Sequence, residues 1–159
     1  MMDPAALAVN QAWGIAGAIV CLGLSATGSG MGTGVAAASA VGAWKKCYAQ
    51  NKPAPFLLLA FVGAPITQTL YGMILMFTML EKAQTGLPLL ILGAFSGLSI
   101  GVSAFYQGKA GAAAADSQGE TGQGLTNYLA ALGIIETVAI FTMVFTLIAI
   151  GKIGVSSGV

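Results

Sequence analysis

One carboxylate stands alone in a highly apolar part of the sequence. Glu136 lies in the stretch ALGIIETVAIF, where the only other residue that is neither apolar nor small is a threonine. An ionised side chain in the middle of a lipid bilayer costs about 3 kcal/mol on insertion scales, and intramembrane carboxylates usually mark ion or proton paths. A glutamate without a function would instead take up a proton and stay neutral. We therefore interpret Glu136 as the candidate ion-binding group.

Other oxygen-bearing side chains have a spacing that suits a shared site with this carboxylate. In GAPITQTLYG, Tyr71 follows Thr67 by four residues and Gln68 by three, so the three side chains share one helical face. Pro65 has no N–H for the carbonyl four residues before it, which favours a kink and leaves nearby carbonyl oxygens free. A further amide, Gln107, interrupts another apolar segment within FYQGKA.

These groups indicate the kind of ion that the site would hold. A proton needs only the carboxylate, whereas a small hard cation prefers several oxygen ligands. The set carries one negative charge, which suits a monovalent ion, and Ala64 lies on the same helical side as Gln68, four residues before it. The loaded site would be neutral and would cross lipid at small cost. We therefore predict Na⁺, with H⁺ as the alternative; Li⁺ fits the same ligands as Na⁺.

The composition indicates that lipid surrounds the elements that position these residues. The chain of 159 residues is 57% hydrophobic and 7% charged, whereas soluble domains carry about 25% charged residues. Four continuous apolar segments are each long enough to cross about 30 Å of hydrocarbon. We predict an all-α membrane protein with four transmembrane helices at about residues 11–44, 55–80, 87–115 and 124–150.

The connectors predict the orientation in the membrane. They read KKCYAQNKPA, EKAQTG and DSQGETGQ, and their short length favours antiparallel neighbouring helices. Lys45, Lys46 and Lys52 lie in the first connector, so the positive-inside rule places the 1–2 and 3–4 loops in the cytoplasm and both termini outside. With a third helix that ends near residue 115, Gln107 reaches the depth of Glu136 only if that helix continues further.

The sequence also repeats itself. GLSATGSGMGTGVAAASA at 23–40 resembles GLSIGVSAFYQGKAGAAAA at 97–115, and QTLYGMILMFT from Gln68 aligns with ETVAIFTMVFT from Glu136. The pattern indicates a duplicated helical hairpin in which Gln68 stands where the second copy has the carboxylate. The predicted units are a first transmembrane hairpin at 1–82 and a second, carrying the ion-site carboxylate, at 83–159.

The glycine-rich stretch GSGMGTG predicts close helix packing. A phosphate-binding loop is disfavoured, because no strand is expected before this stretch and no Gly-Lys-Ser/Thr follows it. Small residues let helix backbones approach closely in lipid. Gly28 and Gly32 share one helical face, and Gly30 and Gly34 share another. Two such faces on one helix predict contacts on several sides.

The residues described above resemble those of the rotor-ring proteolipid of V-type rotary ATPases, in particular the Na⁺-transporting bacterial form. The resemblance covers nearly the whole chain and includes PITQTLYG, YQGKA and IIETVAIF. It implies that Tyr71 bonds to the carboxylate and helps to lock the site. The ion-binding residues that the resemblance implies are Thr67, Gln68, Gln107, Glu136 and the backbone carbonyl of Ala64.

The resemblance also implies partners and a location. It predicts a ring of identical copies in the lipid of a bacterial plasma membrane, with central-stalk subunits and a stator subunit that supplies a cationic residue. The sequence has no arginine, so an arginine in that role must belong to a partner. The resemblance implies no catalytic site in this chain, and ATP hydrolysis would occur in partner subunits. The net charge of +1 gives no sign of a nucleic-acid partner.

Three other classes of function compete with this one. A cation-coupled secondary transporter would dimerise around a midplane site, but the sequence lacks the varied polar groups of a substrate pocket. A structural membrane bundle without transport predicts that Glu136→Gln changes no activity. An enzyme is disfavoured because the chain has no histidine and shows no nucleophile–base pair. Cys21 and Cys47 match no metal-binding spacing and are expected to be plain thiols.

Overall fold

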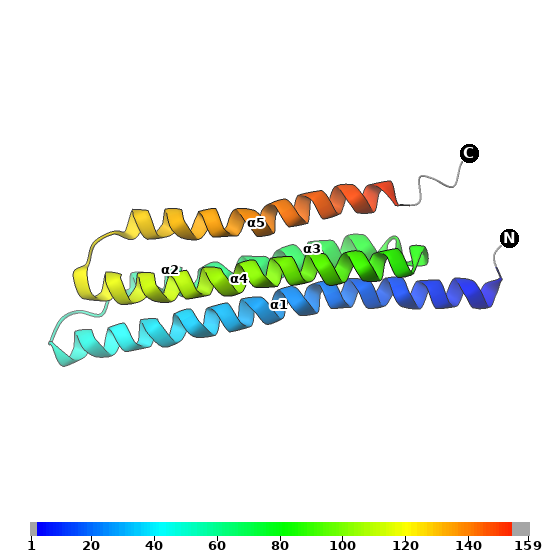
Figure 1. Ribbon diagram of the computed structural model, residues 1–159. Coiled ribbons are helices and arrows are strands. Elements are labelled where there is room, and N and C mark those ends of the chain that lie inside the picture. Colours follow the sequence, from blue (N-terminus) through cyan, green and yellow to red (C-terminus); the bar gives the residue numbers. More distant parts are fainter. Residues whose placement is uncertain (1–2, 154–159) are drawn as a thin grey trace.

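The computed structural model describes residues 3–153 as a bundle of long helices (Figure 1). Its elements in chain order are α1 (Pro4–Ala49), η1 (Phe56–Leu58), α2 (Leu59–Gly63), η2 (Ala64–Ile66), α3 (Thr67–Leu80), η3 (Ala83–Thr85), α4 (Leu87–Thr121) and α5 (Leu125–Lys152), where η marks a 3-10 helix. The described part of the chain contains no strand. The predicted all-α fold is confirmed.

The predicted ends of the first and third helices were wrong. Helix α1 begins at Pro4, well before residue 11, because the Asp3 side chain accepts a hydrogen bond from the Ala5 amide at 3.3 Å and proline suits the first helical position. Helix α4 continues past 115 to Thr121 and stops at Gly122, which has a φ of +69°. Glycine adopts this left-handed conformation at little cost.

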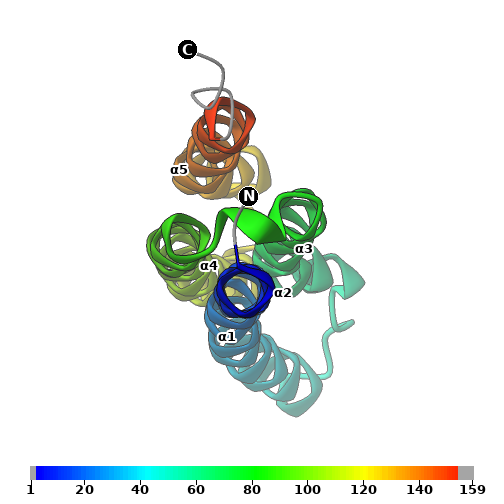
Figure 2. The same ribbon diagram turned by 90° about the vertical axis from the view of Figure 1, so that its right-hand side faces the viewer.

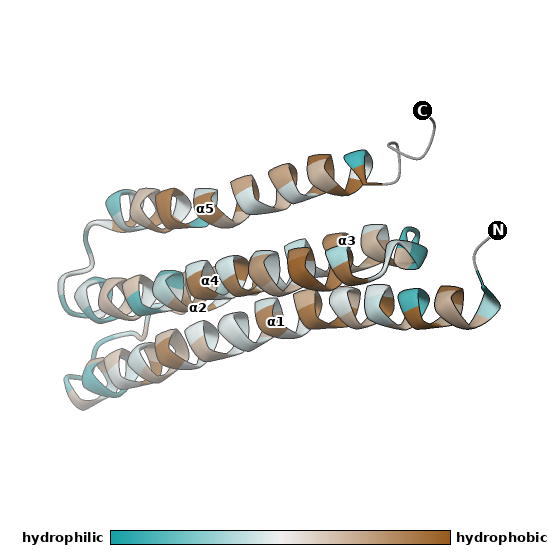
Figure 3. Ribbon diagram, turned by 45° about the vertical axis from the view of Figure 1, so that its right-hand side comes forward, coloured by the Kyte–Doolittle hydropathy of each residue, from teal (hydrophilic) through white to brown (hydrophobic). Residues whose placement is uncertain are grey.

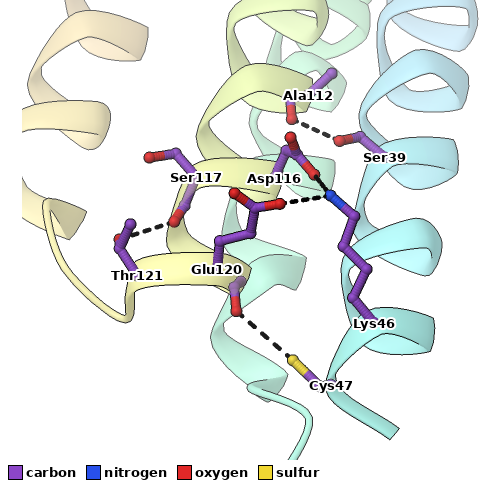
Figure 4. A network of polar contacts seen from close by, with 9 residues as sticks. Ser39, Lys46, Cys47, Ala112, Asp116, Ser117, Glu120 and Thr121 are labelled. Atoms are coloured by element: carbon purple, nitrogen blue, oxygen red, sulfur yellow. Dashed lines mark hydrogen bonds and ion pairs between the residues drawn. The ribbon is translucent and has the colours of Figure 1, made fainter. Parts of the chain in front are cut away.

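Ion pairs explain why the predicted connectors are partly helical. Lys46 Nζ lies 2.9 Å from Asp116 Oδ1 and 2.7 Å from Glu120 Oε1 (Figure 4). Asp116 and Glu120 are one helical turn apart on α4, so both reach the same lysine near the end of α1. All three side chains are about half exposed, and such pairs contribute little stability individually. They nevertheless align the ends of α1 and α4.

The two helices with the most extensive mutual contact, α1 and α4, pack backbone to backbone. A Cβ atom on Gly28 would overlap the backbone of Gly101, and one on Gly108 would overlap the backbone of Gly32. The packed glycine face is therefore confirmed. Cβ positions on Gly30 and Gly34 meet no atom within 4 Å, so this second face stays open in the single chain.

The end-on view shows how the bundle is organised (Figure 2). Helices α1, α3 and α4 form a triangle, and α5 lies on the far side of α3 and α4 from α1. Both α1 and α4 run in one direction and α3 and α5 in the other, as duplicated hairpins require (Figure 1). The division of the chain at residue 82 stays a prediction.

The surface of the bundle suits lipid (Figure 3). Four helical segments are long and apolar enough to cross a membrane: Pro4–Ala49, Phe56–Leu80, Leu87–Thr121 and Leu125–Lys152. Large apolar side chains point outward from them; Phe95 is 70% exposed and Ile134 is 71% exposed. Aromatic and aliphatic surface of this extent marks a membrane or protein contact. The chain is an integral membrane protein.

Candidate ion-binding site

The second membrane segment is interrupted next to the site. The 3-10 helix η2, Ala64–Ile66, separates α2 from α3, and Pro65 lies within it. Proline cannot donate the backbone hydrogen bond that a continuous α-helix needs at this point. The carbonyl oxygen of Ala64 is thereby turned toward Thr67, which approaches it with both its backbone N–H and its hydroxyl group, the latter at 3.0 Å.

Glu136 on α5 receives contacts from two other helices. On α3, the hydroxyl groups of Thr67 and Tyr71 each donate to Glu136 Oε1 at 2.7 Å. On α4, Gln107 Nε2 lies 3.4 Å from Glu136 Oε2. The carboxylate is half-buried between these helices. Gln107 was expected to reach the depth of Glu136 only if the third membrane helix continued past residue 115. Helix α4 does continue past that residue, to Thr121.

Two fully buried amides form the floor of the site. Gln68 Nε2 donates to Gln107 Oε1 at 2.8 Å, and both side chains have no exposed surface. Gln107 Nε2 in turn donates to the backbone carbonyl of Leu132 at 3.0 Å. These bonds connect α3, α4 and α5 within the membrane, where bulk water cannot replace a lost hydrogen-bond partner. Burial makes each bond costly to lose.

The Thr67 hydroxyl group lies at the centre of a cluster of oxygen atoms from three other residues. Its single hydroxyl hydrogen faces three acceptors, Ala64 O at 3.0 Å, Gln68 Oε1 at 3.1 Å and Glu136 Oε1 at 2.7 Å. A hydroxyl group donates only one hydrogen. A small hard cation, in contrast, is bound by several oxygen atoms at once. The cluster therefore has the donor set that such a cation requires.

The charge of the donor set limits the ion. Within residues 3–153, no group of three or more His, Cys, Asp or Glu side chains is placed to hold a metal ion. Glu136 contributes one negative charge, and the remaining oxygen atoms belong to neutral groups. A monovalent cation leaves this site electrically neutral, whereas a divalent cation leaves a net charge inside the membrane.

The structure brings all the sequence-predicted site residues into one contact network. They are Ala64, Thr67, Gln68, Tyr71, Gln107 and Glu136. Their role in ion binding stays a prediction. Sequence analysis missed the Leu132 carbonyl, which holds the Gln107 amide, and Ser103, which donates to the Ile135 carbonyl at 2.9 Å. The available signal was spacing, because each lies one helical turn before a predicted site residue.

Comparison with known protein families bears on the second hairpin. Residues 90–156 match the family model that describes the C subunit of ATP synthase. This match supports membership of the rotor-ring proteolipid family. No curated protein sequence matches the chain. The proteolipids of this family are non-catalytic subunits that form oligomeric rings in rotary ATPases.

The family match covers only part of the site. Gln107 and Glu136 lie inside the matched residues, whereas Thr67, Gln68 and Tyr71 lie in the first hairpin, outside them. The contacts from the first hairpin to the carboxylate are therefore an independent observation. They show that both hairpins contribute side chains to one cluster around Glu136.

Proposed function

We propose that this protein is a membrane rotor-ring subunit of a V-type rotary ATPase that binds and carries Na⁺ at Glu136 during ATP-driven rotation. The observation that carries the proposal is the oxygen cluster around Thr67, in which one hydroxyl hydrogen faces three acceptors. Na⁺ would be bound by side chains of Thr67, Gln68, Gln107 and Glu136 and by the carbonyl of Ala64. It is the cargo of the protein.

The charge state of the site provides the transport mechanism. When the cation binds, the carboxylate is neutralised and the loaded subunit faces lipid at small cost. When the cation leaves, Glu136 is charged and its exposure to lipid is unfavourable by several kcal/mol. The ring therefore turns through lipid only with loaded sites. A stator cation would pair with the emptied carboxylate, and an arginine in that role would belong to a partner, because the chain itself has no arginine.

Tyr71 and Thr67 hold the carboxylate in a binding geometry. Both hydroxyl groups donate to the same oxygen, Glu136 Oε1, at 2.7 Å. Hydrogen bonds from neutral donors to an ionised carboxylate are strong and directional. They keep the side chain of Glu136 turned inward, toward Gln68 and Gln107, and away from lipid. This arrangement lowers the rate at which a bound ion escapes during rotation.

The number of carboxylates favours a V-type pump. Gln68 occupies in the first hairpin the place that Glu136 has in the second, so four helices would carry one ion. Each charge that crosses the membrane gains or costs about 2.3 kcal/mol per 100 mV. A ring with fewer ions per turn works against a larger ion gradient for the same ATP energy.

Carbodiimide labelling of the purified membrane complex tests the proposal. The reagent attacks protonated carboxyl groups, so we expect modification at Glu136 that Na⁺ slows strongly at fixed pH and that K⁺ at equal ionic strength does not. The Glu136→Gln variant is the control for the modified residue. Labelling that depends on pH but not on Na⁺ contradicts Na⁺ transport and supports the H⁺ alternative. Absence of labelling at Glu136 contradicts both.

A further inference from the structure

Two hydroxyl groups on α1 are buried without a hydrogen-bond partner. Ser29 is only 4% exposed, and neither its Oγ nor Thr33 Oγ1 has a partner within the described part of the chain. Neighbouring hydroxyl groups on α1 behave differently, since Ser25 and Thr27 each donate to the carbonyl four residues earlier at 2.8 Å. A buried polar group without a partner is destabilising.

The helix register places Ser29 opposite Gln68. A Cβ atom on Gly72 would lie 2.6 Å from Ser25 Oγ, and one on Gly32 would lie 3.2 Å from the Pro65 side chain. Because α1 and α3 are antiparallel, one helical turn from the first contact leads from Ser25 to Ser29 on α1 and from Gly72 to Gln68 on α3. The orphan hydroxyl of Ser29 thus lies on the side of Gln68 that faces away from Glu136.

The duplicated hairpin indicates what these hydroxyl groups replace. In the alignment of 23–40 with 97–115, Ser29 and Thr33 correspond to Ser103 and Gln107. In the second hairpin, Ser103 donates to a carbonyl of the partner helix, and Gln107 reaches it with an amide. Thr33 has a shorter side chain than Gln107. Its hydroxyl therefore does not reach as far toward a neighbouring helix as the Gln107 amide does, and it has no partner within the described residues.

Gln68 has a hydrogen atom available for this space. Its amide nitrogen carries two hydrogen atoms, and one of them is donated to Gln107 Oε1 at 2.8 Å. Its oxygen faces the Thr67 hydroxyl at 3.1 Å. By this register, three polar groups lie at one level of the α1–α3 interface: the second amide hydrogen of Gln68 and the hydroxyl groups of Ser29 and Thr33. A buried water molecule typically makes about three hydrogen bonds to such groups.

We propose that one water molecule binds between α1 and α3, accepting a hydrogen bond from Gln68 Nε2 and donating to Ser29 Oγ and Thr33 Oγ1. It holds the Gln68 amide with its nitrogen toward α1 and its oxygen toward Thr67 and the cation. Ser29 is thereby a positioning residue for the Na⁺ site. This inference rests on the proposed function for its effect on affinity, but not for the water itself.

The test uses the purified complex and measures two quantities: the protection of Glu136 by Na⁺, and carbodiimide labelling in the absence of Na⁺. For Ser29→Ala, we expect the Na⁺ concentration that half-protects Glu136 from carbodiimide to rise about tenfold, as the loss of about 1.4 kcal/mol predicts. Labelling without Na⁺ should be unchanged, because a proton needs only the carboxylate. The control Thr27→Ala, whose hydroxyl bonds within α1, should leave both values unchanged. Unchanged half-protection in Ser29→Ala, or altered labelling without Na⁺, overturns the positioning role.

A high-resolution map of the wild-type complex tests the water independently of the cation. We expect a peak within hydrogen-bond distance of Ser29 Oγ and Gln68 Nε2, and its loss in Ser29→Ala. A wild-type map without this peak overturns the inference even if Ser29→Ala does not assemble. If Na⁺ fails to protect the wild-type protein, the proposed function fails, whereas the peak still decides whether the water is bound.

Discussion

At the scale of single residues, the chemistry of the site depends on how Glu136 is held. Sequence patterns pointed to the five polar residues of the contact network, because polar side chains in apolar segments are rare and expensive. The backbone carbonyl of Ala64 was implied by the family resemblance. The Leu132 carbonyl could not be predicted from residue type, since every residue has such a group. It becomes relevant only because the Gln107 amide reaches it at 3.0 Å.

The Tyr71 hydroxyl should affect Na⁺ binding without being an ion ligand. It donates to Glu136 Oε1 at 2.7 Å, and a hydrogen bond to a charged group contributes about 1.5–3 kcal/mol. We expect Tyr71→Phe to raise the Na⁺ concentration needed for half-protection from carbodiimide about tenfold. Tyr106→Phe is the matched control, because Tyr106 is 56% exposed and forms no hydrogen bond with Glu136 within the described residues. Equal responses of the two variants would contradict the locking role of Tyr71.

At the scale of elements, local signals were informative where side chains decide the structure and misleading at helix ends. The Gly28 and Gly32 face and the break at Pro65 follow from steric properties that a sequence displays directly. The end of α4 does not, because charged residues resemble a loop until Lys46 is known to pair with Asp116 and Glu120. That tertiary contact, together with Gly122, sets the boundary.

The packing of α1 against α4 leads to a prediction for two glycines on the same helix. A Cβ atom on Gly28 would overlap the backbone of Gly101, whereas one on Gly23 meets no atom within 4 Å. Both alanine substitutions favour the helix by about 1 kcal/mol. We expect Gly28→Ala to lower the thermal stability of the purified protein, because overpacking costs about 1–3 kcal/mol. In the dissociated single chain, Gly23→Ala should not lower it, and similar melting temperatures for both variants would refute this packing.

At the scale of the whole molecule, the single chain leaves surfaces that another copy would cover. The face with Gly30 and Gly34 is open, and large apolar side chains such as Phe95 point outward. The sequence predicted the number of helices and the duplication, because both depend on patterns along one chain. Contacts between copies leave only open glycine and apolar surfaces on the single chain. The number of copies in a ring therefore cannot be predicted from sequence patterns.

The most direct test of the central claim is a high-resolution map of the purified assembly in Na⁺. The account predicts a closed ring in which each chain has one density peak at Na⁺–oxygen distances from Glu136, Thr67, Gln68 and Gln107. The peak should disappear when Na⁺ is removed. A solitary dimer, or a ring in which the Glu136 side chain is remote from Gln68 and Gln107, would contradict the account.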